Sequence, residues 1–212
     1  MVLRLTPGAV VEVVGPAGLA PARVTTVFPP AGLGLTLTGP WARAESLGGL
    51  RLALALIQGP RFDWAVEKSV ELGAGALTPL ITERTKGAEA RCGQSRGARW
   101  QRLAEEARKQ CGRSTPLTIS PVMTLKELLT EAGASAEPGF YLNPGGEPRP
   151  AGLTSAGETP LLVIGPEGGL SPAETAALET AGFRPWGLGA AILRSETAAL
   201  AALAVYRAAR EG

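Results

Sequence analysis

The spacing of apolar and polar positions changes once along this chain, close to residue 50. In the first forty residues, apolar side chains alternate with small or polar ones at a period of about two, which is typical of half-exposed strands. We therefore predict an antiparallel meander with strands Ala9–Val14, Ala22–Phe28 and Leu33–Thr38 and turns Gly15–Pro21 and Pro29–Gly32. A meander of this size needs a partner surface to be stable. The next segment, Gly39–Gly49, is predicted to be a linker.

From Leu50 onward the pattern alternates between short apolar runs and segments with helical spacing. The predicted strands are Leu50–Ile57, Ala76–Ile81, Gly139–Leu142 and Leu161–Ile164, and the predicted helices include Phe62–Leu72, Arg99–Cys111 and Leu125–Ala132. The inner faces of the first two helices are expected to be Phe62, Ala65, Val66 and Val70, and Trp100, Leu103, Ala104, Ala107 and Cys111. Alternation of this kind favours an α/β layer with a mainly parallel sheet.

Two segments near the C-terminus, Leu161–Gly169 and Leu188–Ala198, share one design. Each is predicted to run from an apolar strand through a glycine-bearing turn into a capped helix. Ser171, Pro172 and Glu174 have the order of a capping box, so a helix should begin directly after the first turn.

Ser195 or Thr197 is expected to cap the final helix, Thr197–Arg210. Two such turns can meet at one edge of a sheet, where glycine lets the backbone approach a small ligand closely. A tight strand-to-helix connection without a ligand explains the first turn equally well. Neither the dinucleotide-binding glycine pattern nor a P-loop lysine is present there, which disfavours a Rossmann dehydrogenase or an NTPase.

Composition narrows the chemistry. The chain has 212 residues, enough for one or two domains, and contains no histidine. The commonest general base and the commonest metal ligand are therefore missing, so catalysis has to use carboxylates, Lys, Arg, hydroxyls or backbone. The cysteines, Cys92 and Cys111, are too few for a disulfide framework or a zinc site, and we predict no metal. No secretion signal or membrane span is recognisable, so we expect a cytoplasmic protein.

Charge is unevenly distributed although the net charge is only +2. Between Arg84 and Arg113, nine residues are basic and three are acidic. This asymmetry is typical of a polyanion-binding face, although a solvated arginine-rich helix face would have the same composition.

Five segments, taken together and in this order, resemble the RsmE family of ribosomal RNA uridine N3-methyltransferases, in the SPOUT superfamily. They are Glu67–Gly73, Thr78–Thr85, Gln110–Arg113, Ile164–Gly169 and Ile192–Ala198. The resemblance implies an α/β domain with a deep trefoil knot in its C-terminal part, which is a rare exception to unknotted topology. It assigns residues 49–212 to this methyltransferase domain and residues 1–48 to a PUA-like β-barrel RNA-binding domain that is shortened at its N-terminus.

The resemblance also implies a reaction, namely transfer of a methyl group from S-adenosyl-L-methionine to N3 of a uridine in 16S rRNA of the small ribosomal subunit. Members of the family are homodimers, with the knot region at the interface. The cofactor would lie in the knot, against residues from three segments: Leu142, Asn143, Ile164, Gly165, Pro166, Glu167, Gly168, Gly169, Leu188, Gly189, Ile192, Leu193, Thr197 and Ala198.

Arg194 and Glu196 are the candidate catalytic residues. Negative charge spreads onto O2 and O4 when uracil N3 loses its proton, and Arg194 is the first candidate to stabilise this charge. Glu196 would orient Arg194 or accept the proton, directly or through water. Relatives often carry arginine where this chain has Ala191. Two alternatives stay open: an RNA-binding or ribosome-assembly protein with weak or lost catalysis, and a knotted methyltransferase that acts on another RNA such as tRNA.

Overall fold

The computed structural model describes residues 5–211, except 16–17, 29–31, 44–48, 88–89, 91–94, 134–136, 149 and 155–158. The chain divides into two compact units, one of residues 1–46 with 108–115 and one of residues 47–107 with 116–212. Cys92, Arg91, the segment Val2–Arg4 and parts of the predicted turns and linker lie outside the described residues.

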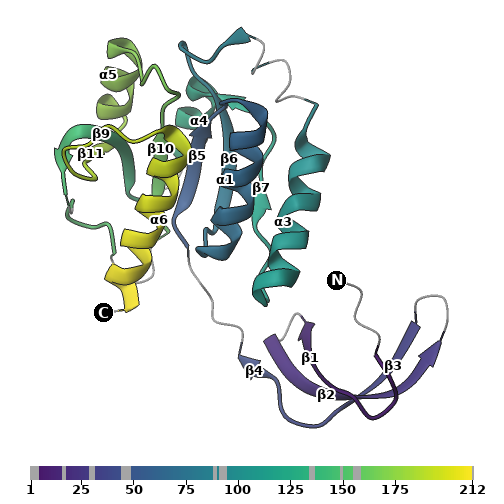
Figure 1. Ribbon diagram of the computed structural model, residues 1–212. Coiled ribbons are helices and arrows are strands. Elements are labelled where there is room, and N and C mark those ends of the chain that lie inside the picture. Colours follow the sequence, from purple (N-terminus) through teal and green to yellow (C-terminus); the bar gives the residue numbers. More distant parts are fainter. Residues whose placement is uncertain are drawn as a thin grey trace. The chain divides into compact units, whose positions relative to one another are not determined.

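The N-terminal unit contains an antiparallel sheet of β1 (Val10–Gly15), β2 (Gly18–Phe28), β3 (Gly32–Leu37) and β4 (Ala42–Arg43), as Figure 1 shows. The predicted meander is confirmed, with β2 between β1 and β3. The turn predicted over Gly15–Pro21 is too long. Gly18–Pro21 already belong to β2, which stays paired with β1 as far as Gly15 and Gly18. The predicted linker also contains β4, which pairs with the start of β2.

The second unit is built on a seven-stranded sheet in which every neighbouring pair is parallel. Its strands are β5 (Arg51–Ala55), β6 (Ala76–Ile81), β7 (Thr118–Ile119), β8 (Met123–Thr124), β9 (Gly139–Glu147), β10 (Leu161–Ile164) and β11 (Arg184–Trp186). Their order is β11-β9-β10-β5-β6-β7, with β8 also beside β6. The predicted α/β fold with a mainly parallel sheet is therefore confirmed.

Helices cover both faces of this sheet (Figure 1). They are α1 (Gly59–Glu71), α3 (Gly97–Cys111), α4 (Leu125–Ala132), α5 (Pro172–Thr180) and α6 (Ser195–Glu211). On β5, Leu52 and Leu54 face a core shared with α1, α3 and α6, whereas Ala53 faces a second core under α4 and α5. Successive residues of a strand point to opposite faces, so each strand supplies both cores.

The predicted inner face of α1 is buried as expected, and so are Trp100, Ala104 and Ala107 of α3. Cys111 is exposed, contrary to prediction, because it stands in the last turn of α3, beyond the sheet-facing residues. Among the described residues, no helix is both long and apolar enough to cross a bilayer.

Three expectations in the C-terminal third are wrong. The predicted strand Gly139–Leu142 is too short, because β9 runs on to Glu147, which pairs with Trp186 of β11 after an irregularity in the register. Leu188–Leu193 do not form a strand, and the strand of that segment is β11, directly before it. The final helix begins at Ser195, so neither Ser195 nor Thr197 is its N-cap, and Ala198 N–H bonds to the carbonyl of Arg194.

Candidate functional site

A cavity of ≈160 Å³ lies at the carboxyl ends of β10 and β11, which is the edge where parallel α/β sheets bind their ligands. Its walls come from the middle of β9, from the turn after β10 and from the segment between β11 and α6. The lining residues are Leu142, Asn143, Pro144, Ile164, Gly165, Pro166, Glu167, Gly169, Leu170, Trp186, Leu188, Gly189, Ala191, Ile192, Leu193, Ser195 and Ala198. The two glycine-bearing segments therefore meet at one sheet edge, as their sequence pattern predicts.

The turn Gly165–Leu170, called the glycine loop below, is shaped by two of its glycines. A Cβ added to Gly165 would lie only 3.0 Å from the Leu170 nitrogen and 3.1 Å from the Gly169 carbonyl carbon. Gly169 has φ +71°, a conformation in which a side chain is strained, and its N–H bonds to the Pro166 carbonyl at 2.8 Å. Larger residues at either position would therefore change the wall of the cavity.

The capping box that follows the glycine loop is present as predicted. Ser171 accepts the Glu174 N–H at 3.1 Å, and the Ser171 N–H bonds to the Glu174 carboxylate at 2.8 Å. The other Glu174 oxygen accepts the N–H of Glu83 at 2.8 Å. The start of α5 is thus tied to the segment after β6.

The first turn of α6 is joined directly to the glycine loop. The Ser195 hydroxyl donates to the Gly165 carbonyl at 2.8 Å, and Ser195 is buried. This contact explains why Ser195 serves as a link between the two segments of the site rather than as a helix cap.

The candidate catalytic residues differ in their surroundings. Arg194 is exposed and forms no ion pair with any described residue, whereas Glu196 is only 7% exposed. Glu196 Oε1 lies 3.8 Å from Nε of Arg61, a residue that sequence reasoning missed. Arg61 Nη1 also donates to Glu167 of the glycine loop at 3.2 Å. The partner of Glu196 in this structure is therefore Arg61 of α1 and not Arg194.

Most of the residues predicted to bind a cofactor line the cavity, but Gly168 and Thr197 do not. Gly168 faces Arg84 instead, and its carbonyl accepts a hydrogen bond from Arg84 Nη1 at 2.6 Å. Pro144, Leu170, Trp186, Ala191 and Ser195 line the cavity without having been predicted. Four of them are next to residues that were predicted to bind the cofactor or to be catalytic. Trp186 belongs to β11, the strand that the sequence pattern did not predict.

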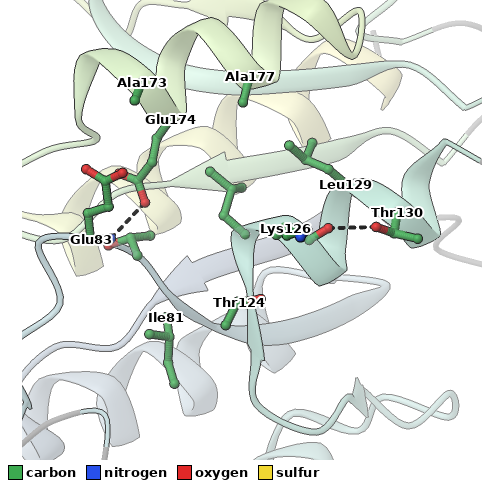
Figure 2. Close-up of a pocket in the computed structure, with 11 residues that line it drawn as sticks. Ile81, Glu83, Thr124, Lys126, Leu129, Thr130, Ala173, Glu174 and Ala177 are labelled. Atoms are coloured by element: carbon green, nitrogen blue, oxygen red, sulfur yellow. Dashed lines mark hydrogen bonds between the residues drawn. The ribbon is translucent and has the colours of Figure 1, made fainter.

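A larger cavity of ≈670 Å³ lies between α4, α5 and the end of β6 (Figure 2). Both helix N-termini beside it are closed by their own capping boxes, Thr124 with Glu127 and Ser171 with Glu174. Figure 2 shows Glu174 also bonded to Glu83, so the two helix N-termini and the Glu174 carboxylate at this end already have partners. The smaller cavity, with its glycine backbone walls, is therefore the better candidate for a ligand site.

Tyr141 of β9 is a poor candidate for the base that a chain without histidine needs. Burial and the neighbouring Glu179 raise the pKa of Tyr141 to about 12, and its hydroxyl donates to Glu179 at 2.7 Å. The phenol stays protonated at neutral pH. Carboxylates remain as the candidate proton acceptors.

The basic segment is partly engaged within the chain. Arg84 bonds to the glycine loop, and Arg99 pairs with Asp63 at 2.8 Å. Arg113 is buried and donates to Thr115, and burial lowers the pKa of its guanidinium. The side chains of Arg99 and Arg102 on α3 are 51% and 67% exposed. A polyanion could therefore meet the exposed face of α3, but not Arg113.

Comparison with known proteins gives a consistent picture. The model of a family described as an RNA methyltransferase domain matches residues 45–207. The ribosomal RNA small subunit methyltransferase E of Synechocystis is 34% identical over 173 residues, which cover 76% of this chain and 53% of that protein. The enzyme of the same name from Bacillus subtilis is 30% identical over 160 residues, covering 72% and 62%. The chain thus spans between half and two thirds of the length of these relatives.

Solved structures agree with the sequence comparison. A ribosomal RNA small subunit methyltransferase E from Neisseria gonorrhoeae, solved with bound S-adenosyl methionine, superposes with a TM-score of 0.80 at 29% identity. The superposition covers 97% of this chain and 85% of that one.

Proposed function

Because this chain belongs to the RNA methyltransferase domain family, we propose that it methylates N3 of a uridine in 16S rRNA of the small ribosomal subunit, with S-adenosyl-L-methionine as methyl donor. The observation that carries the proposal is the cavity in which the two glycine-bearing segments meet. The names of the relatives and the ligand of the Neisseria structure support the choice of substrate and cofactor.

The residues of the cavity fit such a cofactor. Leu142, Ile164 and Leu188 offer apolar surface to a flat heterocycle, and the glycine-bearing segments offer backbone groups rather than side chains. Small-molecule sites typically combine apolar walls with a few placed polar groups. Once bound, S-adenosyl-L-methionine supplies a methyl group already activated by its sulfonium.

The protein then has to position the base and manage one proton. Arg194 is exposed beside the cavity wall that Leu193 and Ser195 form, where it can stabilise the negative charge that develops on uracil O2 and O4. Glu196 accepts the N3 proton, directly or through water. Its side chain is buried, and its Oε2 has no hydrogen-bond partner among the described residues. A general base of this kind contributes about 10²- to 10⁴-fold to the rate.

The proposal extends to the architecture. Residues 49–212 form a SPOUT methyltransferase domain with a trefoil knot and dimerise through the knot, while residues 1–48 belong to a PUA-like RNA-binding domain. The path of the chain supports the knot. β11 is the edge strand and is separated from β10 by β9. The next helix, α6, packs on β5 and β10. Residues 187–194, which connect β11 to α6, therefore run back across the carboxyl ends of β9 and β10. The antiparallel sheet of β1–β4 supports the RNA-binding assignment.

The decisive experiment is methyl transfer from labelled S-adenosylmethionine to small subunits that lack 3-methyluridine, followed by nucleoside analysis. Label in 3-methyluridine is the expected result. Transfer to tRNA in preference to small subunits would contradict the substrate assignment, and cofactor binding without any transfer would favour an RNA-binding protein.

The roles of the two candidate catalytic residues are tested in the same assay. Arg194→Ala and Glu196→Gln should each lower kcat while cofactor affinity stays close to that of the wild type. An Arg194→Ala variant with near-normal turnover would remove that residue from the mechanism.

A further inference from the structure

Arg61 joins two parts of the site that are far apart in sequence. Arg61 is in the first turn of α1, which follows the carboxyl end of β5 (Figure 1). In the sheet, β5 is the neighbour of β10, the strand that leads into the glycine loop. One guanidinium nitrogen, Nη1, lies 3.2 Å from Oε1 of Glu167, and another, Nε, lies 3.8 Å from Oε1 of Glu196. A single side chain thus contacts the glycine loop and the first turn of α6.

Glu196 depends on this arginine for its charge balance. Its side chain is 9% exposed, and among the described residues its one ion pair is with Arg61. A buried carboxylate is costly unless it is paired, so an opposite charge at this distance favours the observed position. The other oxygen, Oε2, is buried and has no hydrogen-bond partner among the described residues.

The geometry suits arginine in particular. A guanidinium presents five donors in a rigid planar fork and can serve two carboxylates at once. A lysine ammonium is a point charge on a flexible stem, so it could neutralise one glutamate without holding the spacing of both. The Ser195–Gly165 hydrogen bond links the same two segments independently, which keeps them together when Arg61 is changed.

We propose that Arg61 is a positioning residue: it holds the Glu196 carboxylate in place for proton transfer and couples it, through Glu167, to the glycine loop that binds the cofactor. The inference rests on the proposed function, because it takes Glu196 as the proton acceptor. Arg61 acts through the two glutamates and does not itself contact the reacting atoms.

The test compares Arg61→Ala, Arg61→Lys, Glu196→Gln and the double variant Arg61→Ala/Glu196→Gln. Because a displacement of about 1 Å can cost about 100-fold in rate, we expect Arg61→Ala to lower kcat about ten- to one-hundredfold with little change in the KM for RNA. Isothermal titration should show an S-adenosylmethionine Kd raised about two- to fivefold, the range for a partly exposed ion pair. Compared with Arg61→Ala, Arg61→Lys should recover part of kcat, because lysine restores the positive charge but not the planar arrangement of guanidinium donors.

The double variant separates positioning from general stabilisation. If Arg61 acts through Glu196, the loss caused by Arg61→Ala should largely disappear in the Glu196→Gln background. Losses that multiply independently would overturn the coupling.

Lys68→Gln is the matched control. Lys68 lies two turns further along α1 and pairs with Glu67 and Glu71 at 2.7 Å, away from the cavity. It should change melting temperature about as much as Arg61→Ala does and leave kcat unchanged.

The outcomes distinguish the two proposals. An Arg61→Ala variant whose kcat matches that of Lys68→Gln, beside an active wild type, would overturn the positioning role alone. A wild-type chain that neither binds S-adenosylmethionine nor transfers methyl groups would overturn the proposed function and this inference with it. Circular dichroism of Arg61→Lys provides the folding check if the alanine variant is poorly folded.

Discussion

Arg84 shows how a residue's role at the site depends on contacts far from it in sequence. The sequence places Arg84 at the start of a basic segment, where binding of a polyanion is the natural expectation. In the structure its guanidinium donates to the Gly168 carbonyl at 2.6 Å, and its side chain packs within 3.4 Å of the position that a Gly168 Cβ would take. Arg84 therefore holds the glycine loop.

We expect Arg84→Ala to weaken binding of S-adenosylmethionine about three- to tenfold, since a charge-assisted hydrogen bond to a partly exposed carbonyl contributes on the order of 1 kcal/mol. Isothermal titration measures this directly. Glu83→Ala is the matched control, because the hydrogen bond from Glu83 to Glu174 uses the backbone N–H, and the Glu83 side chain is exposed. Unchanged cofactor affinity in Arg84→Ala, with weakened RNA binding, would restore the phosphate-contact interpretation.

At the scale of elements, the predictions succeeded where local signals are strong. β6 and α4 have the bounds Ala76–Ile81 and Leu125–Ala132 that the sequence predicts, and the box Ser171–Glu174 begins α5. They failed where an element is stabilised by its partner in the sheet rather than by its own sequence. β11 has three residues and is stabilised by its neighbour β9, so no periodicity marks it. α6 begins at Ser195, two residues before the predicted Thr197, and the Ser195 hydroxyl bonds to Gly165 instead of capping the helix.

The cap of α5 should be measurable in the stability of the whole unit. Replacing Ser171 by Ala removes the acceptor of the Glu174 N–H, and loss of an N-cap costs about 1 kcal/mol. For a chain of this size that corresponds to a melting temperature lower by about 2–4 °C. Thr180→Ala, at the other end of α5, should have a smaller effect. Equal effects of the two variants in calorimetry would contradict the capping role.

Acid sensitivity should appear in α4. Hydrogen bonds from the Thr124 backbone N–H and hydroxyl hold the pKa of Glu127 below its ordinary value of 4.5. A carboxyl whose pKa is lowered by folding stabilises the protein fully above its unfolded pKa and loses this contribution as the pH falls through the folded pKa. The difference in unfolding free energy between wild type and Glu127→Gln should thus be constant above pH 4.5 and shrink below it.

Urea titrations at a series of pH values measure that difference. Glu131→Gln, an exposed change on the same helix, is the control. A difference that grows toward acid would show that the sign of the linkage is wrong.

For the whole molecule, the order of the strands makes the site. β11 lies outside β9, and the chain must return past both β9 and β10 to reach α6. The return brings Leu188–Leu193 against the glycine loop and closes the cavity. The site therefore exists only when β9, β10, β11 and α6 are all in place.

Ligand binding should consequently stabilise the entire α/β unit. S-adenosylmethionine at 100 times its Kd should add about 2.7 kcal/mol to the unfolding free energy. In a chain of this size that raises the melting temperature by roughly 5–10 °C. ATP, which shares the adenosine but carries a triphosphate, serves as the control in a thermal shift assay. Stabilisation by ATP alone would contradict the proposed cofactor.

The sequence alone determined the features that arise within a few residues of each other. These are the strand-period region before residue 50, the alternating strands and helices after it, the glycine-bearing turns and the Ser171–Glu174 cap. They follow from backbone conformation and side-chain spacing, which neighbours in the chain control. The absence of histidine is also read directly from the sequence. Only the tertiary structure decided that Arg61 pairs with Glu167 and Glu196 and that Arg84 holds Gly168. Those contacts join residues that are 84 or more positions apart in the chain, and the packing of the sheet and its helices brings them together.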